Sequence, residues 1–243
     1  FPVFGVYFSQ DDFFHFKVSQ SDGSFWGFLN LFGFLPFEEK GIAFYRPISR
    51  ELLFNLYYPV FGLNALPFRV FSFFVHFINI YLVYLLVQTL FHKKALAFFV
   101  SFFFGIASAN VASLYYLAGG IQTLLATTFT LLSLIFFCNF LKTKLARFKL
   151  FAFLSFLLGI SSHEQAMIIP LLLLGLIFLF DNLKNFKKYI VELLPYFLVS
   201  MTVFYLEISI IGFSSSEIQY QVIYNIKTVV NTLFWYAAWA LGI

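Results

Sequence analysis

Three short groups of ionisable residues stand out in this chain because their types could carry out chemistry. They are Asp11-Asp12 in SQDDFFHF, Tyr45-Arg46 in FYRPIS and His163-Glu164 in SSHEQ. An acidic pair in a chain that is otherwise almost wholly apolar is costly to keep dry and is usually functional. The planar guanidinium of Arg46 has the shape that binds a phosphate group. These groups are therefore the first candidates for a functional site.

Each group also has a purely structural interpretation. Adjacent acids cannot point the same way on a helix, so one of Asp11 and Asp12 is expected to face a site while the other caps the following turn. The alternative is that both are exposed, inert caps. Arg46 could instead extend to lipid head groups. Glu164, beside His163, could cap a helix that starts near Ala166.

The composition places these groups in an integral membrane protein. Hydrophobic residues make up 61% of the 243 residues, charged residues only 11%, and the mean hydropathy is +0.89. An ordinary soluble domain has about 25% charged residues. The 40 phenylalanines are expected to be mostly lipid-facing bulk. The single cysteine, Cys138, excludes a disulfide framework, and the basic residues gather at helix ends, which argues against a nucleic-acid partner.

The hydrophobic pattern predicts an all-α, polytopic transmembrane bundle of about seven spans. A spanning helix needs about 20 apolar residues. The predicted spans are Leu66–Phe91, Ala95–Leu117, Gly119–Leu141, Leu150–Ser162, Ala166–Phe180, Tyr189–Phe213 and Val222–Ile243. Residues 1–8 are expected to be the end of a truncated first transmembrane helix, and residues 66–243 to form the bundle.

The distribution of charge predicts the orientation of the bundle. Nine of the 15 Lys and Arg residues lie in three short turns between predicted spans. These are Lys93 and Lys94; then Lys142, Lys144, Arg147 and Lys149; then Lys184, Lys187 and Lys188. The positive-inside rule puts such turns in the cytoplasm. Residues 9–65, the SSHEQ turn and most of the acids are then expected on the outer, non-cytosolic side, where any chemistry would take place.

The predicted outer loop, residues 9–65, has its own amphipathic segment. The stretch SFWGFLNLFGFLPF (24–37) is aromatic and is interrupted by Gly27, Gly33 and Pro36. It is typical of short helices that lie in the membrane interface. A loop of this length is usually a functional loop or a lid, and the alternative is a linker resting on the membrane.

The order of these features resembles the GT-C superfamily of membrane glycosyltransferases, and especially enzymes of the protein O-mannosyltransferase and aminoarabinose-transferase types. The resemblance is carried by SQDDFFHF, then FYRPIS, then FGLNALPFRVFSFFVHFINIYLVY, and lastly the SSHEQ turn. It extends over nearly the whole chain. It implies a multi-pass protein of a bacterial inner (plasma) membrane, a polyprenyl-phosphate sugar donor, a protein or glycan acceptor, membrane lipid around it, and inversion at the anomeric carbon.

The resemblance also implies roles for the candidate residues. The catalytic base lies in the pair Asp11 and Asp12, with Asp11 favoured, and Arg46 stabilises the leaving phosphate, beside Tyr45. Glu164, next to His163, would bind sugar or acceptor or help to hold a divalent cation, which relatives use in some cases only. Two other interpretations stay open: a transporter or flippase for an amphipathic lipid, and a non-catalytic membrane scaffold, since relatives often have an arginine in the turn that here contains Gly119-Gly120.

Overall fold

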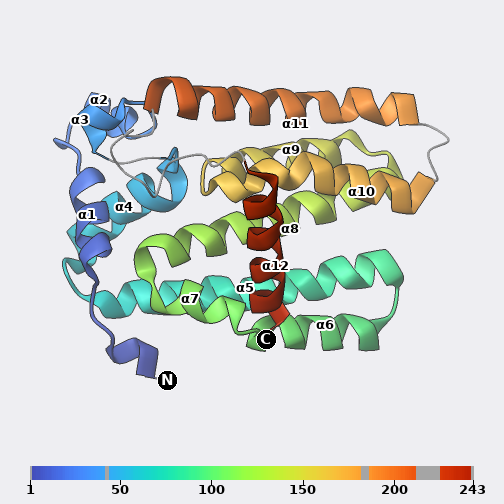
Figure 1. Cartoon of the computed structure of the whole chain (residues 1–243), viewed down its shortest axis with the longest axis horizontal. Coiled ribbons are helices and arrows are strands. Elements are labelled where there is room, and N and C mark those ends of the chain that lie inside the picture. The colour runs from blue at the N-terminus through green and yellow to red at the C-terminus, as the bar shows by residue number, and fades with distance from the viewer. Residues whose placement is uncertain (1, 42–43, 182–185, 212–224, 242–243) are drawn as a thin grey trace.

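The computed structural model describes residues 2–41, 44–181, 186–211 and 225–241. Within these ranges the protein is all-helical and contains no strand. The long helices lie side by side along the longest axis, and the short N-terminal elements gather at one end of them (Figure 1). The predicted all-α fold class is confirmed.

Three helices are long and apolar enough to cross a membrane: α5 (Ala65–Phe91), α8 (Leu117–Thr143) and the segment Tyr189–Ile211, which joins most of α11 (Phe186–Leu206) to a π-helical turn, η4 (Glu207–Ile211). A fourth span results if α6 (Lys94–Ile106) and α7 (Ala109–Tyr115), bent by 53°, are taken as one. The composition and these helices agree in making this a membrane protein.

The prediction of seven spans is not confirmed. The segment predicted as Leu150–Ser162 is α9 (Ala146–Ile160), only 15 residues long. A 3-10 turn, η3 (Glu164–Ile168), precedes α10 (Ile169–Asp181), and together they form a short apolar helix. The last prediction, Val222–Ile243, begins outside the described residues and continues as the 16-residue α12 (Ile226–Leu241). A helix of this length covers about 24 Å, less than the thickness of a hydrocarbon core.

Helix α8 is the central helix of the bundle. Its buried side chains contribute to three apolar clusters: one with α9, α10 and α11, one with α1, α4 and α5, and one with α5 and α6. The outward faces of the surrounding helices carry exposed aromatic rings, among them Phe74 and Phe77 on α5 and Phe98 and Phe102 on α6. Part of the phenylalanine excess therefore lies on outward faces of the helices, where lipid would contact the protein.

The N-terminal region consists of short elements packed on one end of the bundle. They are the 3-10 turn η1 (Pro2–Gly5), α1 (Gln10–Val18), α2 (Phe25–Asn30), α3 (Phe37–Lys40), the π-helix η2 (Pro47–Leu52) and α4 (Leu53–Phe61). Where the sequence suggested the end of a spanning helix, η1 is a single turn whose Phe4 packs on Phe73 of α5. The amphipathic stretch 24–37 is indeed broken into short pieces, of which α2 is the longest.

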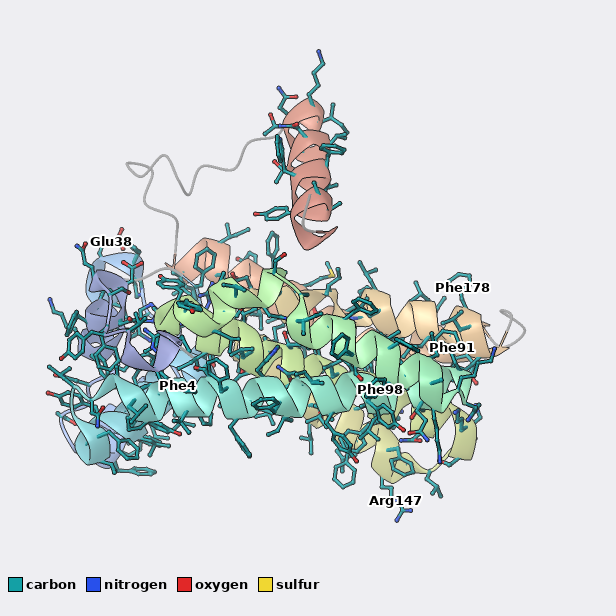
Figure 2. All side chains as sticks on the ribbon, turned by 90° about the horizontal axis from the view of Figure 1, so that it is seen from below. Phe4, Glu38, Phe91, Phe98, Arg147 and Phe178 are labelled. Atoms are coloured by element: carbon teal, nitrogen blue, oxygen red, sulfur yellow. The ribbon has the colours of Figure 1, made fainter. Side chains whose placement is uncertain are left out.

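Acidic and basic regions lie at opposite ends of the bundle. Figure 2 shows Glu38 of the N-terminal region at one end and Phe91, Arg147 and Phe178 at the other, where α5 and α10 end and α9 begins. The basic turns at Lys93 and around Arg147 are thus on one side and the acidic segment 9–65 on the other. This separation is the arrangement that the alternating loops predicted.

Candidate functional site

Two loops that are far apart in the sequence join at the N-terminal end of the bundle. The backbone N–H of Ile48 in η2 donates to the carbonyl of Ser161 at 3.1 Å, and the Ser49 hydroxyl donates to the carbonyl of Ser162 at 2.5 Å. Proline at the first position of η2 removes an N–H that would otherwise lack a partner inside the helix. These contacts hold the FYRPIS segment directly against the SSHEQ turn.

Arg46 is the centre of the resulting site. Its Nε and Nη2 donate to the two carboxylate oxygens of Glu164 at 2.9 and 2.7 Å, which makes a two-pronged ion pair. Its Nη1 donates to the side-chain oxygen of Gln122 on α8. The ring of Phe44 lies 4.9 Å from the guanidinium carbon. Arg46 is therefore fixed by groups from three segments of the chain while part of it stays accessible, with 13% of its side chain exposed.

Gln122 extends this network to helix α1. The side chain of Gln122 is fully buried, and its amide nitrogen lies 3.3 Å from Nδ1 of His15. Burial, together with the charges of Arg50 and Arg46, lowers the pKa of His15 to about 4. His15 is therefore neutral at physiological pH, and its Nδ1 can accept the amide hydrogen of Gln122.

The acidic pair divides into two different environments. Asp12 is 1% exposed, and its Oδ2 accepts from the Ser9 backbone N–H at 2.7 Å and from the Ser9 hydroxyl at 3.0 Å. It thereby fixes the start of α1. Asp11 is exposed and accepts a 2.6 Å hydrogen bond from the hydroxyl of Tyr116. One member of the pair thus has the capping role that the sequence predicted, and the other is left accessible.

Tyr116 is held in place by the tight connection between α7 and α8. Gly120 lies against the backbone of Ser113 so closely that any Cβ would overlap the Ser113 carbonyl. Arg69 of α5, 1% exposed, donates to the carbonyls of Leu114 and Tyr115 at 3.2 and 2.6 Å. Its other terminal nitrogen donates to the carbonyl of Tyr7 at 3.1 Å, just before α1. Arg69 therefore links the segment that carries Tyr116 to the segment that leads to Asp11.

Tyr45 and His163 support the site from behind. The ring of Tyr45 stacks on Phe34 at 3.9 Å, and its backbone N–H donates to Oε1 of Glu207 in η4 at 3.0 Å. His163 accepts the N–H of Gln165 at its Nδ1, and burial with the nearby charge of Arg46 lowers its pKa to about 4. Tyr45 is therefore a packing residue here, and His163 is a neutral cap of η3.

The Glu164 carboxylate stays ionised. Burial acts to raise its pKa, but the charge and hydrogen bonds of Arg46 outweigh that effect, so the net pKa lies below the usual range. The hydroxyl of Tyr116 shows the opposite effect: burial and then the hydrogen bond to Asp11 raise its pKa. At neutral pH the site therefore contains ionised Arg46 and Glu164 and a protonated Tyr116.

A second, buried charge cluster includes Arg50 and Glu51, two residues of η2 itself. Glu51, 1% exposed, accepts from Arg50 at 2.6 Å and from Lys40 at 2.6 Å. Arg50 also donates to the carbonyl of Phe44 at 2.8 Å, directly before the site. Burial acts to raise the pKa of Glu51, and the charges of Arg50 and Lys40 reverse this, so the carboxylate is held ionised.

An apolar cavity of about 480 Å³ opens beside the site, between α5, α6 and α7. Its lining includes Phe73 and Phe77 of α5, Phe102 of α6, and Leu114 and Tyr115, the two residues before Tyr116. Cavities of this size hold drug-sized or lipid-sized apolar groups.

Of the six residues predicted from sequence, the structure joins Arg46 to Glu164, with His163 3.4 Å from the Glu164 carboxylate. Asp11 forms a separate contact with Tyr116, and the backbone of Tyr45 bonds to Glu207. Asp12 is buried and is not part of the accessible site.

Four residues that contact the site were not predicted from the sequence as site residues. Gln122 was detectable as an isolated amide in an apolar helix, and His15 as a residue four positions after Asp11, on the same helix face. Tyr116 and Glu207 carried no local signal, because each acquires its partner through tertiary packing.

The expected divalent cation has no obvious ligands in the part of the chain that the structure describes. There, no group of three or more His, Cys, Asp or Glu side chains is arranged to hold a metal ion. The carboxylate of Glu164 is instead bound by Arg46. No family model matches this sequence, and neither the curated proteins nor the solved structures contain a match.

Proposed function

We propose that this chain is a membrane glycosyltransferase that moves a sugar from a polyprenyl-phosphate carrier to a protein or glycan acceptor, with inversion at the anomeric carbon. The observation that carries the proposal is the network in which SQDDFFHF, FYRPIS and SSHEQ meet at one end of an apolar bundle. The same three motifs carry the resemblance to GT-C enzymes. Their meeting in space is what a shared active site requires.

Asp11 is the proposed catalytic base. It is exposed, whereas Asp12 is buried and bound to Ser9, so only Asp11 can reach a substrate hydroxyl. The Tyr116 hydroxyl donates to one oxygen of Asp11 and orients the carboxylate. The second oxygen is then the atom that accepts the acceptor's proton.

The proposed reaction is a single displacement. The acceptor oxygen forms a bond to the anomeric carbon as its proton passes to Asp11. The bond between that carbon and the phosphate oxygen breaks, and the lipid phosphate leaves with the electron pair. Attack on the face opposite the leaving group inverts the anomeric carbon.

Arg46 is the proposed partner of the leaving phosphate. A guanidinium has five N–H donors, and the bonds to Glu164 and Gln122 use three of them. The remaining donors can bind a phosphate oxygen and stabilise the charge that develops there. The bidentate bond to Glu164 orients the guanidinium group of Arg46 before the lipid-linked sugar binds.

The apolar cavity beside Tyr116 supports a lipid-linked donor. Its lining by Phe73, Phe77 and Phe102 suits an apolar lipid chain, and Tyr115 of the lining directly precedes Tyr116, the partner of Asp11. The opposite placement of the basic turns supports a site on the non-cytosolic side.

The position of the charged groups favours an enzyme over a transporter. Within the described spans, Arg69 lies near the first residue of α5 and Glu207 at the start of the last turn, η4. His76, in the middle part of α5, is buried and is held by the carbonyl of Gly105. A transporter would be expected to have ionisable residues near the middle of its spans.

The proposal is tested with the full chain in lipid nanodiscs and radiolabelled polyprenyl-phosphate mannose, glucose and aminoarabinose, with protein and glycan acceptors. We expect transfer from at least one donor, and a fall in kcat of at least about 100-fold in Asp11→Asn, because the proton acceptor is lost.

Glu38→Gln is the matched control, because Glu38 is an exposed acid of the same region at the surface. It should transfer sugar at the wild-type rate. Full turnover in Asp11→Asn would remove Asp11 as the base, and the absence of transfer from every donor would overturn the proposed function.

A further inference from the structure

A second cavity, of about 640 Å³, lies in the N-terminal region between the end of α1, the loop 19–24, α2 and α4. It is separate from the Arg46 network and shares no lining residue with the apolar cavity. Its volume is within the range of sites that hold small organic ligands, about 300–1,000 Å³.

Neutral hydrogen-bonding groups form one part of the lining. They belong to Ser19, Gln20, Ser21, Ser24 and Asn55. The Asn55 amide donates to the Ser19 carbonyl at 3.0 Å and to the Ser21 hydroxyl at 3.3 Å, which holds the loop in shape. The Ser19 hydroxyl donates to the Arg50 carbonyl and the Ser24 hydroxyl donates to Asp22. The amide oxygen of Asn55, the amide of Gln20 and the hydroxyl hydrogen of Ser21 are the groups that can bind a ligand.

Aromatic rings form the other part. Phe16 and Phe54 are buried and pack edge to face at 4.9 Å, and Tyr58 lies 5.5 Å from Phe16. Phe28 of α2 also borders the cavity. The face of an aromatic ring carries partial negative charge and attracts polarised C–H groups.

Among the residues that the structure describes, the lining contains no Asp, Glu, Lys, Arg or His side chain. A neutral saccharide has the complementary chemistry, since it combines many hydroxyl groups with an apolar face of C–H bonds. A phosphate, an acidic glycan or a charged peptide would have no ionic partner in this lining.

We infer that this cavity binds a neutral oligosaccharide, and that the acceptor of the proposed transfer is such a glycan rather than a protein. The identification as acceptor rests on the proposed function, whereas the binding itself does not.

The geometry of α1 connects the cavity to the proposed base. Asp11, His15 and Ser19 are spaced four residues apart, so they follow one face of the helix. Asp11 and Ser19 are separated by a rise of about 12 Å. A glycan held at Ser19 would therefore need more than one sugar unit to present a hydroxyl at Asp11, which predicts an oligosaccharide acceptor.

The test is equilibrium binding to the full chain in nanodiscs without any donor. The probes are mannobiose and N,N′-diacetylchitobiose, with a neutral proline-rich peptide and a glucuronate-containing disaccharide for comparison. We expect saturable binding of a neutral disaccharide only. Asn55→Ala and Tyr58→Ala should each weaken it by about tenfold or more, through loss of a hydrogen bond or of ring contact.

Two controls match these variants. Asn30→Ala changes an exposed asparagine of α2 outside the lining, and Tyr81→Ala changes an exposed tyrosine of α5; both should bind like the wild type. Gln20→Ala, at an exposed position of the loop, provides a third lining variant that should fold if Asn55→Ala does not.

The outcomes separate the two proposals. Preferential binding of the peptide or the acidic disaccharide, absence of neutral saccharide binding, or equal affinity in lining and control variants would each overturn the inference. Asp11→Asn should retain saccharide binding and lose transfer. Saccharide binding without any transfer would contradict the proposed function and support the saccharide site. Transfer without saccharide binding would support the proposed function and contradict the saccharide site.

Discussion

Two acid–base clusters lie at η2, one at its N-cap residue Arg46 and one within it at Arg50 and Glu51. They differ in how much water can reach them. In the cluster Arg46–Glu164 the side chains are 13% and 27% exposed. In the cluster Arg50–Glu51 they are 2% and 1% exposed. The first joins segments that are 118 residues apart, while the second joins neighbours. Both clusters contain an ion pair, so the pair itself does not distinguish them. What distinguishes a structural cluster from a site that a ligand can enter is the degree of burial.

The buried cluster is expected to hold the shape of the site. Taking ionised groups out of water is costly, and the cost is offset only when every charge has its partner. Glu51 neutralises two cations, Arg50 and Lys40, and Arg50 in turn holds the Phe44 carbonyl. The ring of Phe44 packs against the guanidinium of Arg46. The buried cluster therefore fixes the backbone directly before Arg46, the first residue of the accessible cluster.

The largest expected effect is on this buried cluster. Glu51→Gln removes a negative charge that pairs with both Arg50 and Lys40 in a buried place. We expect a loss of about 3–5 kcal/mol in the free energy of unfolding. Chemical unfolding of the purified protein in detergent measures it.

Glu39→Gln serves as the control, because Glu39 is an exposed acid close in the chain to the same cluster. Its stability should stay within about 0.5 kcal/mol of the wild type. A loss in Glu51→Gln no larger than this would show that the cluster is not needed for the fold.

The next effect is a dependence of stability on pH through the two buried histidines. His15 and His163 have pKa values of about 4 in the folded protein against 6.5 unfolded. Between these values the unfolded chain binds protons that the folded chain does not, so stability falls as the pH is lowered from 6.5 towards 4. Each histidine accounts for at most about 3 kcal/mol of this loss.

His15→Gln keeps a hydrogen-bonding side chain beside Gln122 and removes the titrating group. Unfolding curves at several values between pH 6.5 and 4.5 should therefore show a shallower loss of stability in this variant. Below that window Glu51 and Glu164, whose folded pKa values are lowered, also lose their contribution as they are protonated. Identical slopes in variant and wild type would mean that His15 is already solvated.

The sequence predicted those features that depend on local composition. The helical class, the long apolar helices and the separation of acidic from basic ends follow from hydropathy and from charge counts in the turns.

The number of spans and the side-chain contacts of the site could not be predicted in this way. The turn at 161–163 lies where the sequence placed it, between the predicted segments Leu150–Ser162 and Ala166–Phe180, but the two helices beside it are short and are not confirmed as spans. Gln122 is remote in sequence from both His15 and Arg46, so its two bonds depend on how α8 packs against α1 and η2. Pairings of this kind arise from tertiary packing.

The smallest expected effect on stability is at the accessible pair. Glu164→Gln retains the shape of the side chain and a hydrogen-bond acceptor for Arg46, and water can solvate the uncompensated charge. The free energy of unfolding should fall by less than about 1 kcal/mol. In the transfer assay, the same variant should change the KM for the lipid-linked donor, because the orientation of Arg46 is altered while Asp11 is untouched. A destabilisation as large as that of Glu51→Gln, with an unchanged KM, would make both clusters structural and would leave Arg46 without a role towards a phosphate.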